Sequence, residues 1–233
     1  MRARALHRAP HLGAVTKPSG LLVHRGWDND RDVLMTRIRD AIGSKVYPLH
    51  RLDRGASGVV LFALSSQSAS AMGALFQARA IDKHYLALVR GASPVAAVID
   101  QPIPRTEGVD RVASVTEIAR ILQLGRYALV LARPLSGRLH QIRRHLKHVS
   151  CPLIGDVRYG KGEHNRLFRE RYGLHRLALH ALSIAFTHPV TGERLCLRAP
   201  VPADLREPLE RWAGEHGSAD PLAAVEAALD ACP

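Results

Sequence analysis

One carboxylate in the stretch PLHRLDRGAS has a basic residue close by on each side. Asp53 lies between Arg51 and Arg54, and Gly55 follows the second arginine. Because nearby positive charge stabilises the anion, this side chain is expected to stay ionised at neutral pH. An ionised carboxylate can act as a nucleophile, a base, a metal ligand or half of a surface ion pair. The ion pair is the usual role, so the surrounding sequence has to decide.

The chain that follows Asp53 favours a functional role. Gly58 precedes the apolar run VVLFAL at residues 59–64, which predicts a buried strand. A turn that leads into a buried strand is held rigidly at the edge of the core, and catalytic side chains are often placed there. Asp53 is therefore a candidate catalytic residue.

Metal and nucleotide sites have little support. His140, His145 and His148 lie close together, but their spacing is not HExxH and the neighbouring arginines would repel a cation. The glycine-rich segment GDVRYGKG at residues 155–162 lacks the GK[ST] ending of a P-loop, and no GxGxxG motif opens a helix. We expect neither a metal nor a cofactor, and a metal hydrolase built on the three histidines is a remote alternative.

The sequence also gives little support for a serine hydrolase or a glycosidase. A serine hydrolase would need a GxSxG elbow, which the sequence lacks. A glycosidase would need a second acid, for which Asp156 and Glu163 are candidates only by elimination. The cysteines form no CxxC pair, which argues against a disulfide framework and a zinc ribbon and fits a reducing cytosol; they are Cys151, Cys196 and Cys232.

The overall charge points to a polyanionic partner. The chain has 33 Lys and Arg against 21 Asp and Glu, a formal net charge of +12. Basic surfaces gather nucleic acids by releasing counterions, although a solvated basic surface is nearly as common. No stretch reaches the ~18 consecutive apolar residues of a membrane span, and no signal peptide opens the chain. We expect a soluble, cytoplasmic protein with no membrane partner.

Apolar residues alternate between strand-like and helix-like spacing along the chain, which indicates a mixed α/β domain. The expected strands span residues 59–64, 84–89, 112–122, 127–131, 179–186 and 194–197. The expected helices span residues 66–79, 137–149 and 202–212. Short connections between the third and fourth strands and between the last two predict two hairpins, so the sheet should be largely antiparallel.

Six segments, in order along the chain, resemble motifs of the RluA-type pseudouridine synthase family. They are TKPSGLLVH, HRLDRGASG, KHYLALVRG, SGRLHQIRRH, CPLIGDVRYG and LALHALSIAFTHPVTGE. Together they cover roughly residues 14 to 202. Ala56 stands where the family signature has threonine. The ordered set is far more specific than any one motif.

This resemblance implies a fold and a reaction. The fold would be α+β: the pseudouridine synthase fold, a largely antiparallel mixed sheet flanked by helices, with a catalytic cleft across its middle. The reaction would be the cofactor-free isomerisation of uridine in RNA to pseudouridine. We expect a basic arm over residues 1–13, one catalytic domain over residues 14–213 and a tail over residues 214–233.

The resemblance also assigns roles to individual residues. Asp53 would be the catalytic aspartate, acting as nucleophile or base, and Arg143 would pair with it. Tyr85 would stack on the target uracil, and Arg51 would enter the RNA where the flipped nucleotide left. Extruding a base costs a few kcal/mol, and stacking on an aromatic ring returns about 1–3 kcal/mol.

Within the family, the chain most resembles the class that modifies uridine 65 of transfer RNA. Ribosomal RNA is the alternative substrate, and a non-catalytic RNA-binding or ribosome-assembly protein of the same fold is the alternative function. We expect a monomer. The basic segment 161–176 is expected to be a surface loop, which either contacts the tRNA backbone or has no partner; its arginines are Arg166, Arg169, Arg171 and Arg176.

Overall fold

Two stretches of chain contribute to each of two structural units. The computed structural model describes residues 4–9, 11–25, 32–105, 110–218 and 220–230. Unit 1 consists of Met1–Lys83 and Ala181–Pro200, and unit 2 consists of His84–His180 and Val201–Pro233. Each unit contains antiparallel strand pairs and helices.

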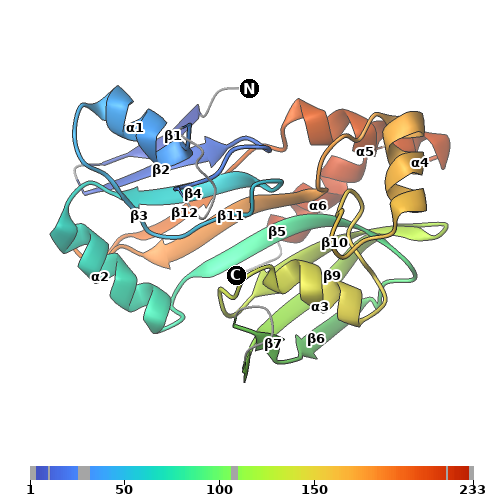
Figure 1. Cartoon of the computed structure of the whole chain (residues 1–233), viewed down its shortest axis with the longest axis horizontal. Coiled ribbons are helices and arrows are strands. Elements are labelled where there is room, and N and C mark those ends of the chain that lie inside the picture. Colours follow the sequence, from blue (N-terminus) through green and yellow to red (C-terminus); the bar gives the residue numbers. More distant parts are fainter. Residues whose placement is uncertain (1–3, 10, 26–31, 106–109, 219, 231–233) are drawn as a thin grey trace. The chain divides into compact units, whose positions relative to one another are not determined.

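Unit 1 is built on an antiparallel sheet in which β2 pairs with β1 and β4, β3 pairs with β4, and β12 pairs with β11 (Figure 1). Its strands are β1 (Arg4–Arg8), β2 (Leu12–Lys17), β3 (Tyr47–Pro48), β4 (Ser57–Ala63), β11 (Leu179–Thr187), which begins in unit 2, and β12 (Arg194–Arg198). Its helices are α1 (Leu34–Ile42) and α2 (Ser66–Gln77). The Ser65 side chain caps α2 by accepting a hydrogen bond from the Ser68 N–H, which fixes where this helix begins.

The glycine of β4, Gly58, lets β4 and β11 approach each other closely. Gly58 has φ +125°, a conformation that side chains with a Cβ rarely adopt. A Cβ atom at this position would lie 2.2 Å from the carbonyl oxygen of Ala181 in β11 and 2.5 Å from its nitrogen. Only glycine fits at the point where the Asp53 turn enters β4.

Replacing Gly58 by alanine should destabilise the protein by about 3 kcal/mol or more, because the new methyl group collides with backbone and the φ angle is unfavourable. Gly73 in α2 is a matched control, because no atom lies within 4 Å of a Cβ built there. Gly73→Ala should stabilise the protein by about 0.5–1 kcal/mol through helix propensity. Urea unfolding checks both variants. Equal stabilities for the two would contradict the packing described at Gly58.

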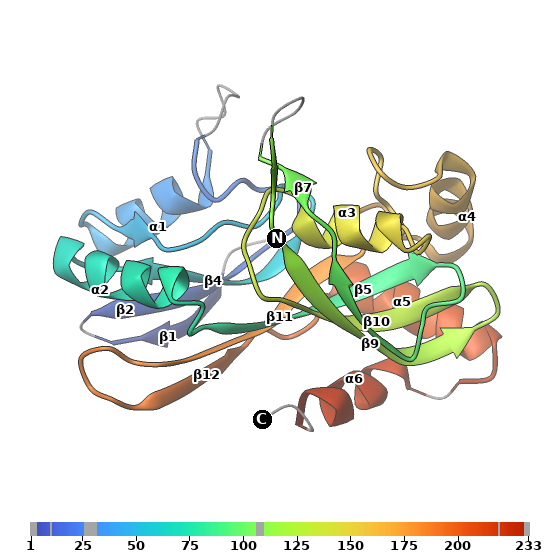
Figure 2. The ribbon, with the colours of Figure 1, turned by 90° about the horizontal axis from the view of Figure 1, so that it is seen from below.

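In unit 2, antiparallel strands follow one another in the order β5, β10, β9 and β6, and β7 and β8 form a separate hairpin. Its strands are β5 (Asp82–Arg90), β6 (Ala96–Asp100), β7 (Ile103–Pro104), β8 (Arg111–Val112), β9 (Val115–Leu124) and β10 (Tyr127–Pro134). Its helices are α3 (Gln141–His148), α4 (Gly162–Tyr172), α5 (Ala203–Glu215) and α6 (Pro221–Asp230). Figure 2 shows α3 and α6 on opposite sides of this sheet.

The expected strands and hairpins are confirmed. β9 and β10 pair antiparallel from Tyr127 opposite Leu124 onward, and β11 pairs antiparallel with β12. β4 is buried along its whole length, as its continuous apolar run predicts. With helices α2 and α5 near their expected bounds and α3 within its expected range, the α+β class is confirmed. The catalytic cleft stays a prediction.

Helix α3 begins later than the sequence predicts, at Gln141 instead of residue 137. His140 has φ 54°, so the backbone turns through the left-handed region just before the helix. The side-chain oxygen of Gln141 accepts hydrogen bonds from the Ser136 hydroxyl at 2.7 Å and the Arg138 N–H at 3.0 Å. These contacts hold residues 136–140 as an ordered loop that leads into α3.

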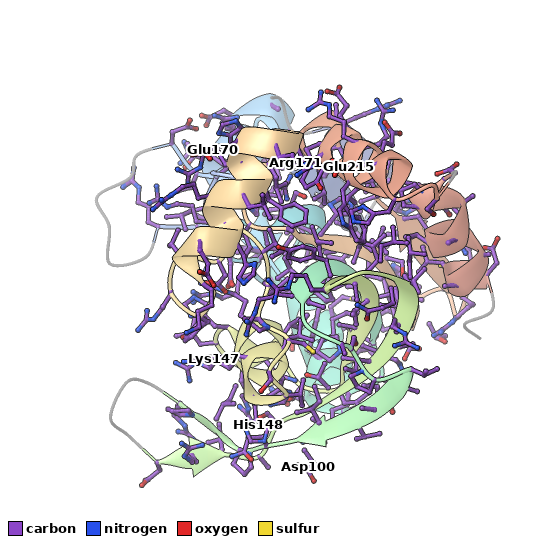
Figure 3. All side chains as sticks on the ribbon, turned by 90° about the vertical axis from the view of Figure 1, so that its right-hand side faces the viewer. Asp100, Lys147, His148, Glu170, Arg171 and Glu215 are labelled. Atoms are coloured by element: carbon purple, nitrogen blue, oxygen red, sulfur yellow. The ribbon has the colours of Figure 1, made fainter. Side chains whose placement is uncertain are left out.

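The prediction of a loop over residues 161–176 is wrong, because most of this segment is the helix α4. Its aromatic residues Phe168 and Tyr172 are buried, at 0% and 5% exposure. Arg171 of α4 forms an ion pair with Glu215 of α5 (Figure 3). Charged residues dominate α4, so its narrow apolar stripe gives a weak helical signal in the sequence.

Secondary structure extends into the segments that were expected to be an arm and a tail. β1 lies within residues 1–13, and α6 lies within residues 214–233, where Val225 and Leu229 are buried. Residues 1–3, 10, 219 and 231–233 lie outside the described part of the chain. The bounds of a catalytic domain at residues 14–213 stay a prediction.

Candidate active site

The turn that carries Asp53 is held by its backbone. The Ala56 N–H donates a hydrogen bond of 3.1 Å to the Asp53 carbonyl, and the Gly20 N–H donates one of 2.8 Å to the Arg54 carbonyl. Asp53 is partly buried, whereas Arg51 and Arg54 are exposed. Arg51 and Asp53 therefore lie on one ordered loop of unit 1, as the sequence predicts.

A buried lysine ties this turn to the end of β2. Lys17 is 1% exposed, and its Nζ donates hydrogen bonds to three carbonyl oxygens. These belong to Leu21 at 2.7 Å, Pro18 at 2.9 Å and Arg54 at 3.2 Å. Burying an ammonium group costs free energy unless its donors form hydrogen bonds. The three carbonyl oxygens therefore stabilise both the buried charge and the conformation of this loop. Sequence reasoning gave Lys17 no role of its own, although it lies in the TKPSGLLVH segment.

A neutral histidine anchors the other side of the same turn. The backbone N–H of Leu61 in β4 donates a hydrogen bond of 3.1 Å to His50 Nε2, which must therefore be unprotonated. Burial, together with the positive charge of Lys83, lowers the pKa of His50 to about 3. The ring also lies 5.6 Å from that of Phe76 in α2. His50 links the turn to β4 and α2 only in its neutral form.

Acid should weaken this anchor. In the unfolded chain His50 takes up a proton near pH 6.5, whereas in the folded protein its pKa is about 3. Its contribution to stability is therefore complete above about pH 6.5 and is lost as the pH falls toward 3, by about 2 kcal/mol at pH 5. His50→Gln keeps an acceptor for the Leu61 N–H and does not titrate.

The measurement for this prediction is urea unfolding of both proteins at about pH 8 and about pH 5. The loss of stability between the two pH values should be about 2 kcal/mol smaller in His50→Gln than in the unmodified protein. An identical pH dependence would show that His50 is protonated as readily in the folded protein as in the unfolded chain.

In unit 2, Arg143 of α3 forms a bidentate ion pair with Asp156. Its Nε lies 2.7 Å from Asp156 Oδ2 and its Nη2 lies 2.9 Å from Oδ1. Both residues are buried, at 9% and 1% exposure. The N–H groups of Arg158 and Tyr159 also donate to Oδ1, at 2.9 and 3.0 Å. This set fixes the direction of the guanidinium group.

The electrostatics of this pair favour the charged state of both partners. Burial alone would raise the pKa of Asp156. The hydrogen bonds and charge of Arg143, with the backbone donors of Tyr159 and Arg158, outweigh burial and hold that pKa below its usual range. The sequence suggested Asp156 only as a possible second acid of a glycosidase. Its position in the GDVRYG segment, which resembles a family motif, was the one sequence feature that pointed to a structural role.

Tyr85 lies on β5 of unit 2, opposite Ala132 of β10, and its side chain is partly exposed. After Tyr85 both faces of this strand are buried, because Leu86 and Leu88 are 1% exposed and Ala87 and Val89 are 0% exposed. The structure thus places Tyr85 and Arg143 in one unit and Arg51 and Asp53 in the other. That Arg143 pairs with Asp53 stays a prediction.

The three histidines near α3 have separate surroundings. His145 is buried and bonds to the hydroxyl of Thr116 at 2.8 Å and to the carbonyl of Gln101 at 2.9 Å. His140 Nδ1 lies 3.1 Å from the Tyr159 hydroxyl, and His148 is exposed. Within the described residues, no group of three or more His, Cys, Asp or Glu could hold a metal ion.

No helix in the described part of the chain is long and apolar enough to cross a membrane.

Known proteins are similar to this chain over most of its length. The family model for RNA pseudouridylate synthases matches residues 11–148, which is more than half of the chain. A "tRNA pseudouridine synthase C" of Vibrio cholerae is 40% identical over 83% of this chain and 89% of its own length. The protein of that name from Haemophilus influenzae is 36% identical over 91% of this chain and 98% of its own length.

Solved structures agree with the family model. The structure titled "Human RNA Pseudouridylate Synthase Domain Containing 4" matches with a TM-score of 0.74 at 27% identity, over 89% of this chain and 92% of that one. "Human RNA Pseudouridylate Synthase Domain Containing 1" matches with a TM-score of 0.70 at 25% identity, over 86% of this chain and 84% of that one. The chain has the pseudouridine synthase fold. It belongs to the RNA pseudouridylate synthase family, and it is an isomerase that acts on RNA.

Proposed function

We propose that this chain is a tRNA pseudouridine synthase that isomerises uridine 65, with Asp53 as its catalytic residue. The observation that carries this proposal is the similarity to proteins named tRNA pseudouridine synthase C, at 36–40% identity over 83–91% of the chain. The net charge of +12 supports a polyanionic substrate of this kind.

The proposed reaction begins when the target uridine leaves the RNA helix. Arg51 fills the space that the nucleotide vacates, and Tyr85 stacks on the extruded uracil, as base-flipping enzymes require. The carboxylate of Asp53, charged and held on its ordered turn, attacks the ribose or abstracts a ribose proton. The bond between C1′ and N1 then breaks, the ring turns, and a bond forms between C1′ and C5. When that bond forms, the bond between Asp53 and the ribose breaks in the first route, and the abstracted proton returns to the ribose in the second. The C5 proton is lost and N1 gains a proton, so no cofactor is consumed.

Arg143 completes the proposed site by pairing with the Asp53 carboxylate. Its bidentate pair with Asp156 supports this role, because a guanidinium group whose direction is already fixed loses little entropy when it binds a second anion. We propose that the enzyme works as a cytoplasmic monomer.

Ribosomal RNA is the alternative substrate. A ribosomal RNA synthase of the same family would use the same residues on a different uridine. The support for a tRNA enzyme is the agreement in name among the relatives, and the same similarity to named synthases argues against a non-catalytic RNA-binding protein.

Mapping pseudouridine in tRNA and ribosomal RNA from cells with and without the gene tests the substrate assignment. We expect one pseudouridine in tRNA, at position 65, to disappear without the gene and to return with the unmodified gene. Loss of a site in ribosomal RNA instead would favour the ribosomal RNA enzyme. Identical maps with and without the gene would contradict an enzymatic role.

A further inference from the structure

Unit 2 contains a pocket of about 620 Å³ to which the proposed reaction gives no role. It lies between α3 and the β7–β8 hairpin, and both elements contribute to its wall. Figure 3 shows the side chains of Lys147 and His148 where α3 ends, and both line this pocket. The volume is within the usual range for pockets that bind small groups.

The pocket is strongly cationic. Four permanently charged side chains line it, and no Asp or Glu is among its lining residues. The four are Arg111 of β8, Arg144 and Lys147 of α3, and Arg158 of the loop after Asp156. Basic residues in the last turn of a helix commonly only offset the helix dipole. That explanation can serve for Lys147, but Arg111 and Arg158 come from other elements.

Two arginines of the wall, Arg144 and Arg111, donate hydrogen bonds to neutral oxygens. Arg144 Nη1 donates to the Pro104 carbonyl at 3.1 Å, and its Nε donates to the Tyr159 hydroxyl at 3.0 Å. Arg111 Nη1 donates to the Pro102 carbonyl at 2.9 Å. Such contacts orient a guanidinium group without neutralising its charge, so the pocket wall stays positive.

Tyr159 connects this pocket to the Arg143–Asp156 pair. Its ring lines the pocket, and the guanidinium carbon of Arg143 lies 5.0 Å from the ring centre. Arg158, Arg144 and Lys147 also lie within 5.6–5.9 Å of that centre. Cations already occupy the surroundings of the aromatic face, so a nucleobase would have to displace them to stack there. The pocket is therefore suited to recognise negative charge and not a base.

We propose that this pocket binds a backbone phosphate of the RNA substrate, at a nucleotide other than the one being isomerised. The inference rests on the proposed function, because it takes RNA as the substrate. Four cations around one concavity, two of them oriented by hydrogen bonds, match a phosphodiester group, and the apolar surface of Pro102, Ile103 and Pro104 can pack against the ribose. Contacts to phosphate position the RNA independently of its sequence.

The test measures the Kd of an unmodified tRNA transcript as a function of salt concentration. Lys147→Gln removes an exposed charge, and the double variant Lys147→Gln with Arg111→Gln removes two. We expect the double variant to weaken binding about tenfold near 0.1 M salt and to reduce the slope of log Kd against log salt by about 1–2. Lys147→Arg should retain the slope. Arg126→Gln, at an exposed arginine in the β9–β10 turn, removes one charge outside the pocket, as Lys147→Gln does inside it, and should change Kd by less than about twofold.

Three outcomes would overturn the phosphate pocket. The first is a double variant that binds tRNA no more weakly than Arg126→Gln. The second is a loss confined to one RNA sequence and absent for an unrelated stem of equal length, since a backbone contact must weaken both. The third is an unchanged salt slope. Because Kd is measured without turnover, a protein that binds RNA through this pocket but makes no pseudouridine would refute the proposed function alone.

Discussion

Asp53→Asn should lower the rate of pseudouridine formation by at least about 10⁴-fold, because an amide can neither attack the ribose nor accept its proton. The affinity for tRNA should remain within about threefold of that of the unmodified protein, since the basic surface and not this one group supplies the binding. The rate is measured with a tRNA transcript in excess, and Kd by filter binding.

Asp40→Asn is the control for Asp53→Asn, because it makes the same Asp-to-Asn substitution outside the candidate site. Asp40 is an exposed residue of α1 in the same unit, and it pairs only at the surface with Arg39. This variant should form pseudouridine within about twofold of the normal rate, because exposed ion pairs contribute little. Comparable rates for the variants at positions 40 and 53 would remove Asp53 from the reaction.

Asp156→Asn should destabilise the protein by about 3–5 kcal/mol, because it leaves the buried Arg143 without its carboxylate. The pKa of Asp156 is held below its usual range, so the stabilisation is present at neutral pH and is lost as acid protonates the group. Urea unfolding at neutral pH measures the loss. At temperatures where the variant stays folded, its kcat should fall at least about tenfold while Kd changes less, because Asp156 positions Arg143.

Glu210→Gln in α5 provides the comparison for this ion pair. Glu210 pairs with Arg206 at 3.1 Å, and both side chains are more than 40% exposed. Removing that carboxylate should cost only about 0.3–0.5 kcal/mol. If Asp156→Asn cost no more than Glu210→Gln, the buried pair would not be the anchor of Arg143 that the geometry indicates.

The regular part of the fold could be predicted because its signals are local. The apolar run of β4, the alternation of β5 and the short turns of the two hairpins each lie within about ten residues of sequence. Helix α4 could not be predicted in this way. Its stability depends on Phe168 and Tyr172 packing into the core of unit 2, and packing is not visible in a segment dominated by charge.

In the candidate site, too, features set by neighbouring residues could be predicted from the sequence, and contacts between distant residues could not. Asp53 could be found from its own neighbours, since the arginines, the glycines and the following strand are adjacent in sequence. The ion pair of Arg143 with Asp156 joins positions 13 residues apart. The hydrogen bond from Lys17 to the Arg54 carbonyl joins positions 37 residues apart. Such contacts depend on how the chain returns on itself, so the structure was needed to find them.

The most direct test of the central claim is a single-turnover experiment with tRNA fully bound to the protein. The amount of pseudouridine formed per bound tRNA is compared between the unmodified protein and Asp53→Asn at the same bound fraction. We predict close to one pseudouridine per tRNA, at position 65, with the unmodified protein and none with the variant. Pseudouridine formed equally fast by both, or by neither, would contradict the account.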